Sequence, residues 1–572
     1  MSFLDFKTRN MPADLTSGAV SALIAIPDAI ASALLAGVNP TYAFDALMTG
    51  TPIGSLLSSS HFMSIGLTSA MMLAVADALV GFDESEFLTA LFTLTVLVGV
   101  FQLILGLLKL GKFTSFISNT VMVGFLTGVA VLVILGQLGD LTGYESEVSS
   151  TIGSAVDTLL HPGEWDLPSL VIGLVTVALI LLLSRTRLKN FSVALAMVIG
   201  TAAVLVLSLD SVAQVGDTTP VSGSFPTPVL PDLSLVTELA LSAVAIGLIG
   251  LIQASGVSQS IPNPDGEYPD ASRDFSAQGI ANVVAGAFQG LPLGGSLGGT
   301  GLVISTGARS RWANVFLGLF VAVFVLLFAL LVDLVAMPTI AAILIVVGIQ
   351  IIDREEVADV WQIQSSKRAI MVVTFIATLT LPIQQAVIIG VFLSFIDYVY
   401  SSSRDVQLFV LRHTEAGTFV EEPAPAELSD DSVTIVFARG STYFAAARTI
   451  QELLPSAKEA RRAVVIGRIR GTTQVGSTMV TVLERYAREL RANGGRLMLS
   501  GVHENVKEQL LRTETTDDIP EDAIFMATEN VGESTRAAVS AAKAWIAQQA
   551  SDATVDSEKA DRDQSGDSAR EV

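Results

Sequence analysis

The sequence predicts a polytopic α-helical membrane protein that carries a separate α/β domain, and three observations support this fold class. The 572 residues are 51% hydrophobic and only 15% charged, which is typical of chains that cross a bilayer several times. Long apolar stretches follow one another as far as Arg404. After Arg404 the composition becomes that of a soluble domain, in which Val-, Ile- and Leu-rich runs alternate with amphipathic stretches.

About fourteen apolar spans are expected, several of them too short to cross a bilayer as straight helices. Their limits are 15–38, 42–57, 67–80, 87–108, 113–138, 167–184, 191–209, 235–257, 275–291, 300–308, 312–334, 335–352, 369–381 and 383–399. Every second connection carries Lys or Arg, and the connections between them carry Asp and Glu. Because basic loops stay on the cytoplasmic side, this alternation predicts a multi-pass protein of the cytoplasmic membrane with both termini in the cytoplasm.

The segment 289–311 is rich in glycine, serine and threonine although it lies between two apolar spans. We expect extended backbone over 291–299 and a short helix that begins near Thr300, inside the membrane. Free N–H groups at a helix start carry positive partial charge and bind an anion without any basic side chain. The segment therefore lines a substrate site or forms a tightly packed turn at the membrane edge.

A second interrupted segment, 58–69, resembles the first in composition. Gly66-x-Thr68 and Gly298-x-Thr300 each stand just before an apolar run. Paired interruptions in the two halves of a membrane protein indicate a transporter site. The expected anion contacts are therefore Thr68, Ser69, Thr300 and Gly301. The alternative is that these small residues only pack helices together.

Two further polar residues lie within apolar spans. Asp28 follows Pro27 in the first span, and a carboxylate inside the membrane indicates function because its burial is costly. Asp28 is thus the expected coupling residue, which binds a proton; the alternative is a satisfied acid at a helix break. The Gln253 amide can donate and accept without charge, so it contacts an oxyanion or bridges two helices.

Several classes of function are disfavoured by the sequence. It has no cysteine and only four histidines, without clustered His, Asp and Glu, so we expect no metal centre and no cofactor. It has neither a paired nucleophile and base nor a phosphate-binding loop, so we expect no enzyme. The net charge of −22 disfavours nucleic acid as a partner.

Motifs along nearly the whole chain resemble the SulP family of anion transporters, relatives of prestin. The segments that carry the resemblance are, in order, IPDAIASALLAGV at 26–38, then 59–68, 278–292, 305–309 and 405–550, which includes GSTYFAAA at 440–447. The resemblance implies a uracil-permease-like fold: fourteen segments in seven-plus-seven inverted repeats, two of them half-helices. It also implies a core domain that moves against a gate domain, a cytoplasmic STAS domain and a homodimer.

The implied domains are a transporter domain over 1–404 and a STAS domain over 405–550. The acidic tail, 551–572, has no apolar periodicity and is expected to be disordered. Within the STAS domain we expect strands at 432–438, 462–466 and 496–500. Helices are expected at 443–459, 473–493 and 502–511.

The resemblance implies that the anion lies between the starts of the third and tenth helices, and two departures from the family pattern fall there. Gln253 stands where many relatives carry an acid, so a coupling proton is favoured over sodium. Gly299 stands where animal relatives carry an arginine. In the STAS loop, Ser477 lies in Gly-Ser-Thr-Met rather than the usual Asp-Ser-Thr/Ser-Gly, which disfavours its phosphorylation.

The expected function is secondary active transport of a small inorganic anion, of the sulfate or bicarbonate class, by an elevator-type movement. One alternative keeps the fold and makes the protein a dicarboxylate or chloride carrier or exchanger. A second alternative, of another class, is a membrane-anchored regulatory protein that acts through its STAS domain.

Overall fold

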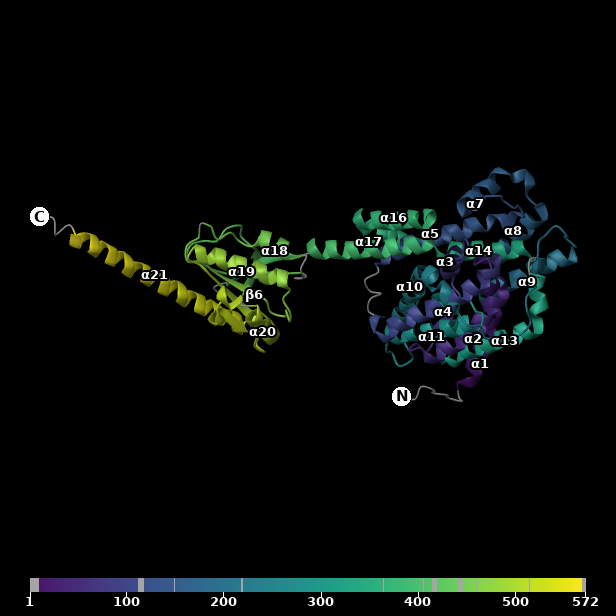
Figure 1. The fold of residues 1–572 in the computed structure, drawn as a ribbon, viewed down its shortest axis with the longest axis horizontal. Helices are drawn as coiled ribbons and strands as arrows, with labels where there is room; N and C mark the ends of the chain where they lie inside the picture. The colour runs from purple at the N-terminus through teal and green to yellow at the C-terminus, as the bar shows by residue number, and fades with distance from the viewer. Residues whose placement is uncertain are drawn as a thin grey trace. The chain divides into compact units, whose positions relative to one another are not determined.

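The computed structural model describes residues 10–111, 118–148, 150–217, 220–363, 365–404, 406–413, 419–440, 446–458, 460–513 and 515–567. The chain divides into two compact units, Met1–Phe395 and Ile396–Val572, both drawn in Figure 1. Helix α17 (Ile383–Arg404) crosses the boundary between them. The first unit is helical apart from one short strand pair, and the second contains a six-stranded sheet.

The first unit is built from long apolar helices interspersed with short ones. The longer helices are α1 (Met11–Leu35), α2 (Pro40–Leu57), α4 (Glu84–Leu107), α5 (Asn119–Gly136), α8 (Leu167–Leu183), α9 (Ser192–Val206), α10 (Val236–Ser260), α11 (Ala271–Ala287), α13 (Trp312–Asp333), α14 (Met337–Ile351), α16 (Ser365–Thr380) and α17. The shorter ones are α3 (Ser69–Ala78), α6 (Leu138–Thr142), α7 (Thr151–Leu160), α12 (Leu297–Ser305) and α15 (Arg354–Ile363).

Within the described residues, eight helices are long and apolar enough to cross a membrane. The predicted polytopic class is therefore confirmed, whereas the count of fourteen spans stays a prediction. Helices α7 and α15 were not predicted from the sequence. Both are short and amphipathic, and their charged or polar positions make them look like connections.

The helices of the first unit pack in two groups. In the core group, α11 packs on α4 and α2, and α13 packs on α1 and α2, while α10 packs on α4. In the gate group, α16 packs on α5, and α14 packs on α8 and α5. Helix α17 joins the gate group, because Gly390 lies against Val121 of α5 and Thr374 of α16. The larger contacts between the groups are those of α1 with α9 and α14, and of α3 with α5.

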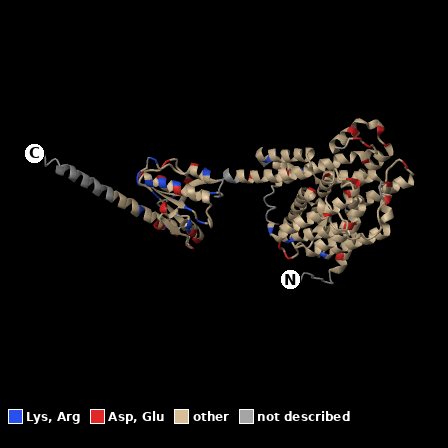
Figure 2. Ribbon diagram, in the orientation of Figure 1, with Lys and Arg blue, Asp and Glu red and all other residues tan. Residues whose placement is uncertain are grey.

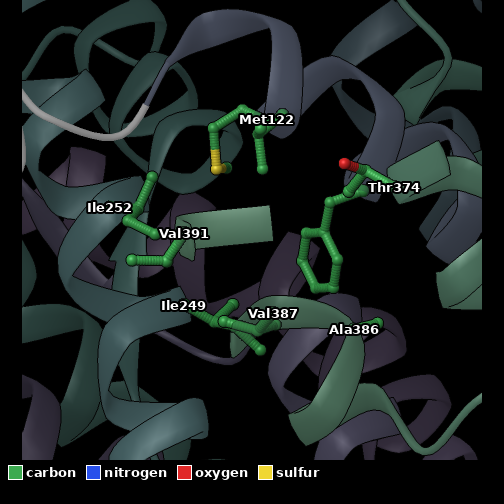
Figure 3. Close-up of a pocket in the computed structure, with 9 residues that line it drawn as sticks. Met122, Ile249, Ile252, Thr374, Ala386, Val387 and Val391 are labelled. Carbon is green, nitrogen blue, oxygen red and sulfur yellow. The ribbon is translucent and has the colours of Figure 1, made fainter. Parts of the chain in front are cut away.

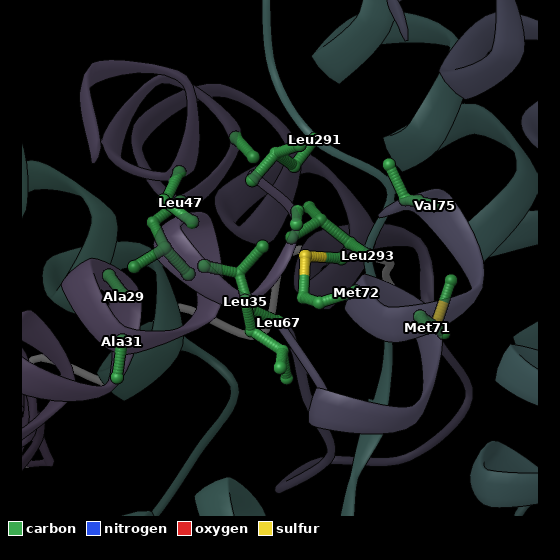
Figure 4. Close-up of a cluster of buried hydrophobic side chains, with 14 of the residues drawn as sticks. Ala29, Ala31, Leu35, Leu47, Leu67, Met71, Met72, Val75, Leu291 and Leu293 are labelled. Carbon is green, nitrogen blue, oxygen red and sulfur yellow. The ribbon is translucent and has the colours of Figure 1, made fainter. Parts of the chain in front are cut away.

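Small residues allow the core helices to approach closely. A Cβ added at Gly99 of α4 would lie 2.5 Å from the backbone nitrogen of Val283, and one at Gly279 of α11 would lie 2.5 Å from that of Leu103. Such backbone contact is typical of helix pairs in membranes. Figure 4 shows part of the buried apolar cluster of this unit, with Leu47 of α2, Met72 of α3 and Leu293, which precedes β2.

Charged residues of the first unit are unevenly distributed. Figure 2 shows acidic residues gathered around α7, whereas basic residues lie near the ends of α4, α11 and α16. This separation follows the alternation of charge that the sequence contains. The orientation in the membrane derived from that alternation stays a prediction.

The second unit is an α/β domain around one sheet. Its strand order is β4-β3-β5-β6-β7-β8, with β3 antiparallel to β4 and β5 and the remaining neighbours parallel. The strands are β3 (Gln407–His413), β4 (Phe419–Pro423), β5 (Val433–Arg439), β6 (Val464–Arg468), β7 (Arg496–Val502) and β8 (Ile524–Met526). The helices are α18 (Ala447–Leu453), α19 (Ser477–Ala492), α20 (Glu504–Arg512) and α21 (Glu533–Asp567).

The three predicted strands correspond to β5, β6 and β7, and the three predicted helices to α18, α19 and α20. Strands β3, β4 and β8 were not predicted. Strand β8 has only three residues, and β4 reads FVEEP, which has little alternation of apolar and polar residues. Helix α21 continues to Asp567, through most of the tail for which the sequence predicts disorder. Residues 568–572, and residues 441–445 of the GSTYFAAA motif, lie outside the described residues.

Candidate functional site

The two interrupted segments meet in a short antiparallel strand pair. Strand β1 (Ser64–Gly66) pairs with β2 (Gly294–Ser296), and Ser64 lies opposite Ser296. Each strand leads into a half-helix, α3 and α12 respectively. We call residues 64–78 the first arm and residues 294–305 the second arm. Because the strands are antiparallel, the two half-helices begin at opposite ends of the pair. The predicted interrupted helices are thus present in both halves.

Close approach to neighbouring helices explains the glycines of the second arm. A Cβ added at Gly295 would lie 2.5 Å from the Ala254 Cα of α10. One added at Gly294 would lie 2.6 Å from the Met71 Sδ of α3. A side chain at Gly295 would have to push the backbone of α10 away, whereas one at Gly294 would displace the Met71 side chain. Gly295 therefore lets the strand pair lie against α10.

The second arm begins its helix earlier than the sequence predicted, at Leu297 rather than near Thr300. The reason is a serine cap: Ser296 Oγ accepts a hydrogen bond from the Gly299 N–H at 3.0 Å. The Thr300 hydroxyl is buried, donates to the Ser296 carbonyl oxygen at 2.6 Å and accepts from the Ser64 N–H at 3.0 Å. Thr300 therefore fastens the two arms together.

The helix start of the second arm also has an open face. Gly298 and Gly301 are exposed, and a Cβ added at either would meet no atom within 4 Å. Leu297, beside them, is 59% exposed. Since the Gly299 N–H is capped, the N–H groups of Leu297 and Gly298 remain as the first-turn donors of α12.

The first arm is enclosed, and its helix start has no side-chain cap. Thr68 is the N-cap residue of α3, but its hydroxyl does not bond to the helix. Instead, Thr68 Oγ1 donates to Gln253 Oε1 of α10 at 3.0 Å. Ser69, the first residue of α3, is only 9% exposed. Thr68, Ser69 and Gln253 are thus brought together, and the Gln253 Nε2 remains as a donor.

Asp28 occupies a different position from the arms. It lies on α1 and is exposed, although its neighbours Pro27 and Ala29 are buried. It forms no hydrogen bond or ion pair with any other residue that the structure describes. Figure 4 shows Ala29 in the same apolar cluster as Leu67, which precedes Thr68 in the chain. The Asp28 segment of α1 is therefore close to the first arm, but no bond links Asp28 to it.

Three polar residues that were not predicted from the sequence hold the arms. Asn282 of α11 accepts from the Leu293 N–H at 2.6 Å and donates to the Leu293 carbonyl at 2.8 Å, just before β2. Buried Asp14 and Asp274 bond to the loops beyond the arms. Asp14 and Asp274 both lie near helix starts, which is the one signal in the sequence. Because Asp is common at ordinary helix starts, this position does not single them out.

An apolar cavity separates the core and gate groups near Gln253. It is lined by Ile249 and Ile252 of α10, by Thr374 of α16, and by residues of α5 and α17, as Figure 3 shows. The volume that the centre of a water molecule can occupy in this cavity is only about 10 Å³, which is about the space that one water needs. The two groups therefore meet here through an imperfectly filled apolar contact.

The chemistry of the arms is that of neutral donors. The residues described above at the two helix starts include no Lys or Arg; they offer N–H groups, hydroxyls and one amide. Among the described residues, no group of three or more His, Cys, Asp or Glu is arranged to hold a metal. Half-helix starts that converge inside an apolar helix bundle can hold a small anion through backbone dipoles.

Two half-helices that begin at a buried strand pair define a membrane transporter of the broken-helix class. Residues 11–374 match the sulfate permease family, and residues 425–531 match the STAS domain. The first match covers more than half of the chain, so the chain belongs to the sulfate permease family. It is therefore an anion transporter with a C-terminal STAS domain, and its family consists of transporters rather than enzymes.

Relatives of known description extend over most of the chain. The Bacillus subtilis protein YvdB, whose name assigns it provisionally to sulfate transport, is 24% identical over 516 residues, covering 89% of this chain and 95% of that protein. The bicarbonate transporter BicA of Synechocystis is 25% identical over 539 residues, covering 90% and 92%.

A solved structure gives the same fold. The murine Solute Carrier 26 family member A9 anion transporter, in its inward-facing state, matches with a TM-score of 0.78 at 17% identity, over 94% of this chain and 92% of that chain. At this identity the match bears on the fold alone.

Proposed function

We propose that this protein carries a small oxyanion, of the sulfate or bicarbonate class, across the cytoplasmic membrane by secondary active transport. One observation carries the proposal: two half-helix starts lie at one strand pair, and the described residues at these starts offer hydrogen-bond donors and include no Lys or Arg. Donors of this kind favour a compact anion that accepts several hydrogen bonds. The relatives named for sulfate and bicarbonate transport support the same class.

Uptake by proteoliposomes that contain the purified protein tests this proposal. We expect labelled sulfate or bicarbonate to accumulate, with competition by the unlabelled anion. Preferential uptake of chloride or fumarate would replace the proposed substrate by a chloride or dicarboxylate carrier. No uptake of any of the four anions by folded protein would favour a regulatory protein that acts through its STAS domain.

The proposed coupling ion is a proton bound by Asp28. Asp28 is exposed on α1 near the first arm, and no described residue neutralises it, so a proton can reach it. Sodium is disfavoured because Gln253 places a neutral amide beside Thr68. Uptake should therefore follow an inward proton gradient in sodium-free buffer. A sodium requirement at a fixed proton gradient would contradict this assignment.

The proposed movement is a displacement of the core group, with the arms, against the gate group. The contact between the groups that would have to open includes Gln384 of α17, whose Nε2 lies 3.4 Å from Ser242 Oγ of α10. In the same region, the Ile383 N–H donates to Asp77 Oδ2 of α3 at 2.9 Å. These few polar contacts can be exchanged for water, so they permit movement.

Cross-linking tests the movement cleanly because the sequence has no cysteine. In the double variant Ser242→Cys, Gln384→Cys, a short bis-methanethiosulfonate reagent should stop uptake by joining the two thiols through disulfide bonds. A reducing agent that cleaves these disulfides should restore uptake. Each single variant serves as a control. Full transport by completely cross-linked protein would show that the two groups do not separate here.

Two further features complete the proposal: both termini are cytoplasmic, and the protein is a homodimer. The alternation of basic and acidic connections supports the orientation, and the resemblance to the family supports the dimer. Labelling of single cysteines at Val80 and Arg309, which are both exposed, tests the orientation from either side of the membrane. The molar mass of the detergent-solubilised protein tests the dimer.

A further inference from the structure

Two buried carboxylates bind the loop that leads into the first arm and the loop that follows the second arm. Asp274 of α11 is 1% exposed, and its charge also acts on the Arg311 guanidinium, which donates to the Ser58 carbonyl oxygen of the same loop. Its Oδ1 accepts from the Ser59 N–H at 2.6 Å and from the hydroxyls of Ser58 and Ser59, both at 2.8 Å. These serines connect α2 to the first arm, so Asp274 fixes the chain just before β1.

Asp14 of α1 does the same for the second arm. It is also 1% exposed. Its Oδ1 accepts from the N–H groups of Arg309 and Ser310 at 2.7 and 3.0 Å, and its Oδ2 accepts from the Ser310 hydroxyl at 2.5 Å. Arg309 and Ser310 follow α12, so Asp14 fixes the chain just after the second arm.

These contacts are strong enough to act as anchors. A buried carboxylate is costly unless hydrogen bonds replace its water, and bonds to an ionised acceptor are stronger than neutral ones. If its loop moved away, each carboxylate would be left buried without these hydrogen bonds. Each loop is therefore held firmly. Both sit on long helices of the core group, since α11 packs on α4 and α2, and α1 packs on α13.

Asp274 also reaches the helix that carries Gln253. Its Oδ2 accepts from the Ser258 hydroxyl of α10 at 2.8 Å. One carboxylate thus ties α10, α11 and the loop before the first arm together. The separation between Gln253 and Thr68, which face each other at 3.0 Å, is fixed from both sides by this connection.

We propose that Asp274 and Asp14 are positioning residues for the anion site, which hold the two half-helix starts in register without touching the anion. The part of the test that measures transport kinetics rests on the proposed function. Asp274 holds the chain where it enters the first arm, next to the strand pair, and Asp14 holds the chain where it leaves the second arm. When either anchor is removed, the donors spread over a wider range of positions, and the site binds its anion less tightly.

The first test compares transport kinetics. Asp274→Asn and Asp14→Asn should each raise the KM for the transported anion roughly tenfold and lower Vmax much less, because an asymmetric amide cannot accept all of these bonds. The single-donor variants Ser59→Ala and Ser310→Ala should shift KM in the same direction by a smaller factor. If an Asp variant does not fold, the KM of these serine variants still tests the proposal.

Asp45 of α2 provides the matched control. It is also 1% exposed, and its Oδ1 has no partner among the described residues. It is a buried core carboxylate that holds neither arm. Asp45→Asn should leave KM within about twofold of wild type. An equal rise in KM for Asp45→Asn and Asp274→Asn would mean that general loosening of the core is responsible, and would overturn the proposal.

The second test does not depend on transport. Spin labels on Val80→Cys, two residues beyond the first arm, and on Ile304→Cys of the second arm, both exposed, report the distance distribution between the ends of the half-helices in a chain without other cysteines. We expect a narrow distribution that Asp274→Asn broadens and Asp45→Asn does not. An unchanged width in Asp274→Asn would overturn the positioning role, even if the protein transports anions. Broadening without any anion uptake would preserve the positioning role and reject the proposed function.

Discussion

The two arms have the same construction but offer different surfaces. Each is a three-residue strand followed by a half-helix. The first arm is enclosed: Leu67 and Ser69 are buried, and its helix start has no side-chain cap. The second arm is capped by Ser296 and open at Gly298 and Gly301. This difference supports the proposal that the first arm is an enclosed wall of donors and that an anion approaches from the second arm.

The threonines at equivalent places differ in the same way. Thr300 uses its hydroxyl on the backbone of Ser64 and Ser296, so it holds the arms together. Thr68 uses its hydroxyl on a side chain of another helix, Gln253. A bond between side chains can rearrange when a ligand arrives, whereas a bond that satisfies buried backbone cannot be lost without cost. Thr68 and Gln253 are therefore the better candidates for direct contact with the anion.

The largest effect is expected from filling the space between the arms. A Cβ at Gly299 would lie 3.1 Å from Ser296 Oγ and 3.2 Å from Ser64 Oγ, so Gly299→Val should push the arms apart and abolish most uptake. Gly298→Ala, whose new methyl group would meet nothing within 4 Å, is the control and should retain uptake. Normal uptake by Gly299→Val would show that the arms need not be in contact.

The next effect separates the two threonines. Thr300→Val should lower the free energy of unfolding by about 1–3 kcal/mol, because the Ser64 N–H would lose its partner in a buried position. Thr68→Val should change stability less and raise KM more. Thermal unfolding gives the stability of both variants, and uptake kinetics give their KM. The opposite ranking would reverse the roles given to the two arms.

A change of charge at Gln253 should have an effect that depends on the anion. In Gln253→Glu, a carboxylate beside Thr68 would repel the substrate, and like charges placed together cost several kcal/mol. We expect KM to rise by about tenfold or more, and uptake to respond to sodium. Gln253→Ala removes the amide without adding charge and should raise KM less. Equal behaviour of the two variants would exclude Gln253 from the anion site.

The smallest effect on selectivity is expected from the second unit. It has its own buried core, including Val465, Leu499 and Val506, and no donor of the anion site lies in it. Truncation after Arg404 should lower expression or Vmax and leave the order of competing anions unchanged, because selectivity depends on differential contacts in the site. A truncated protein that inserts normally but prefers another anion would contradict this.

The sequence contained enough to predict the interrupted helices but not their internal bonds. Glycine, serine and threonine between apolar spans predicted both arms, since only such residues allow irregular backbone at membrane depth. The start of α12 was placed wrongly because Ser296 and Thr300 are both acceptable near a helix start, and only the geometry shows that Ser296 caps the helix. Asp14 and Asp274 were missed because a buried carboxylate and a solvated one look alike in sequence.

Uptake by the Gly301→Trp variant shows whether the anion passes between the two arms. Gly301 is exposed on the open face of the second arm, and nothing lies within 4 Å of an added Cβ, so the protein can accept the indole without unfolding. We expect an unchanged unfolding temperature, normal membrane insertion and loss of anion uptake in proteoliposomes. Normal uptake by a correctly folded Gly301→Trp variant would show that the anion does not pass between the two arms.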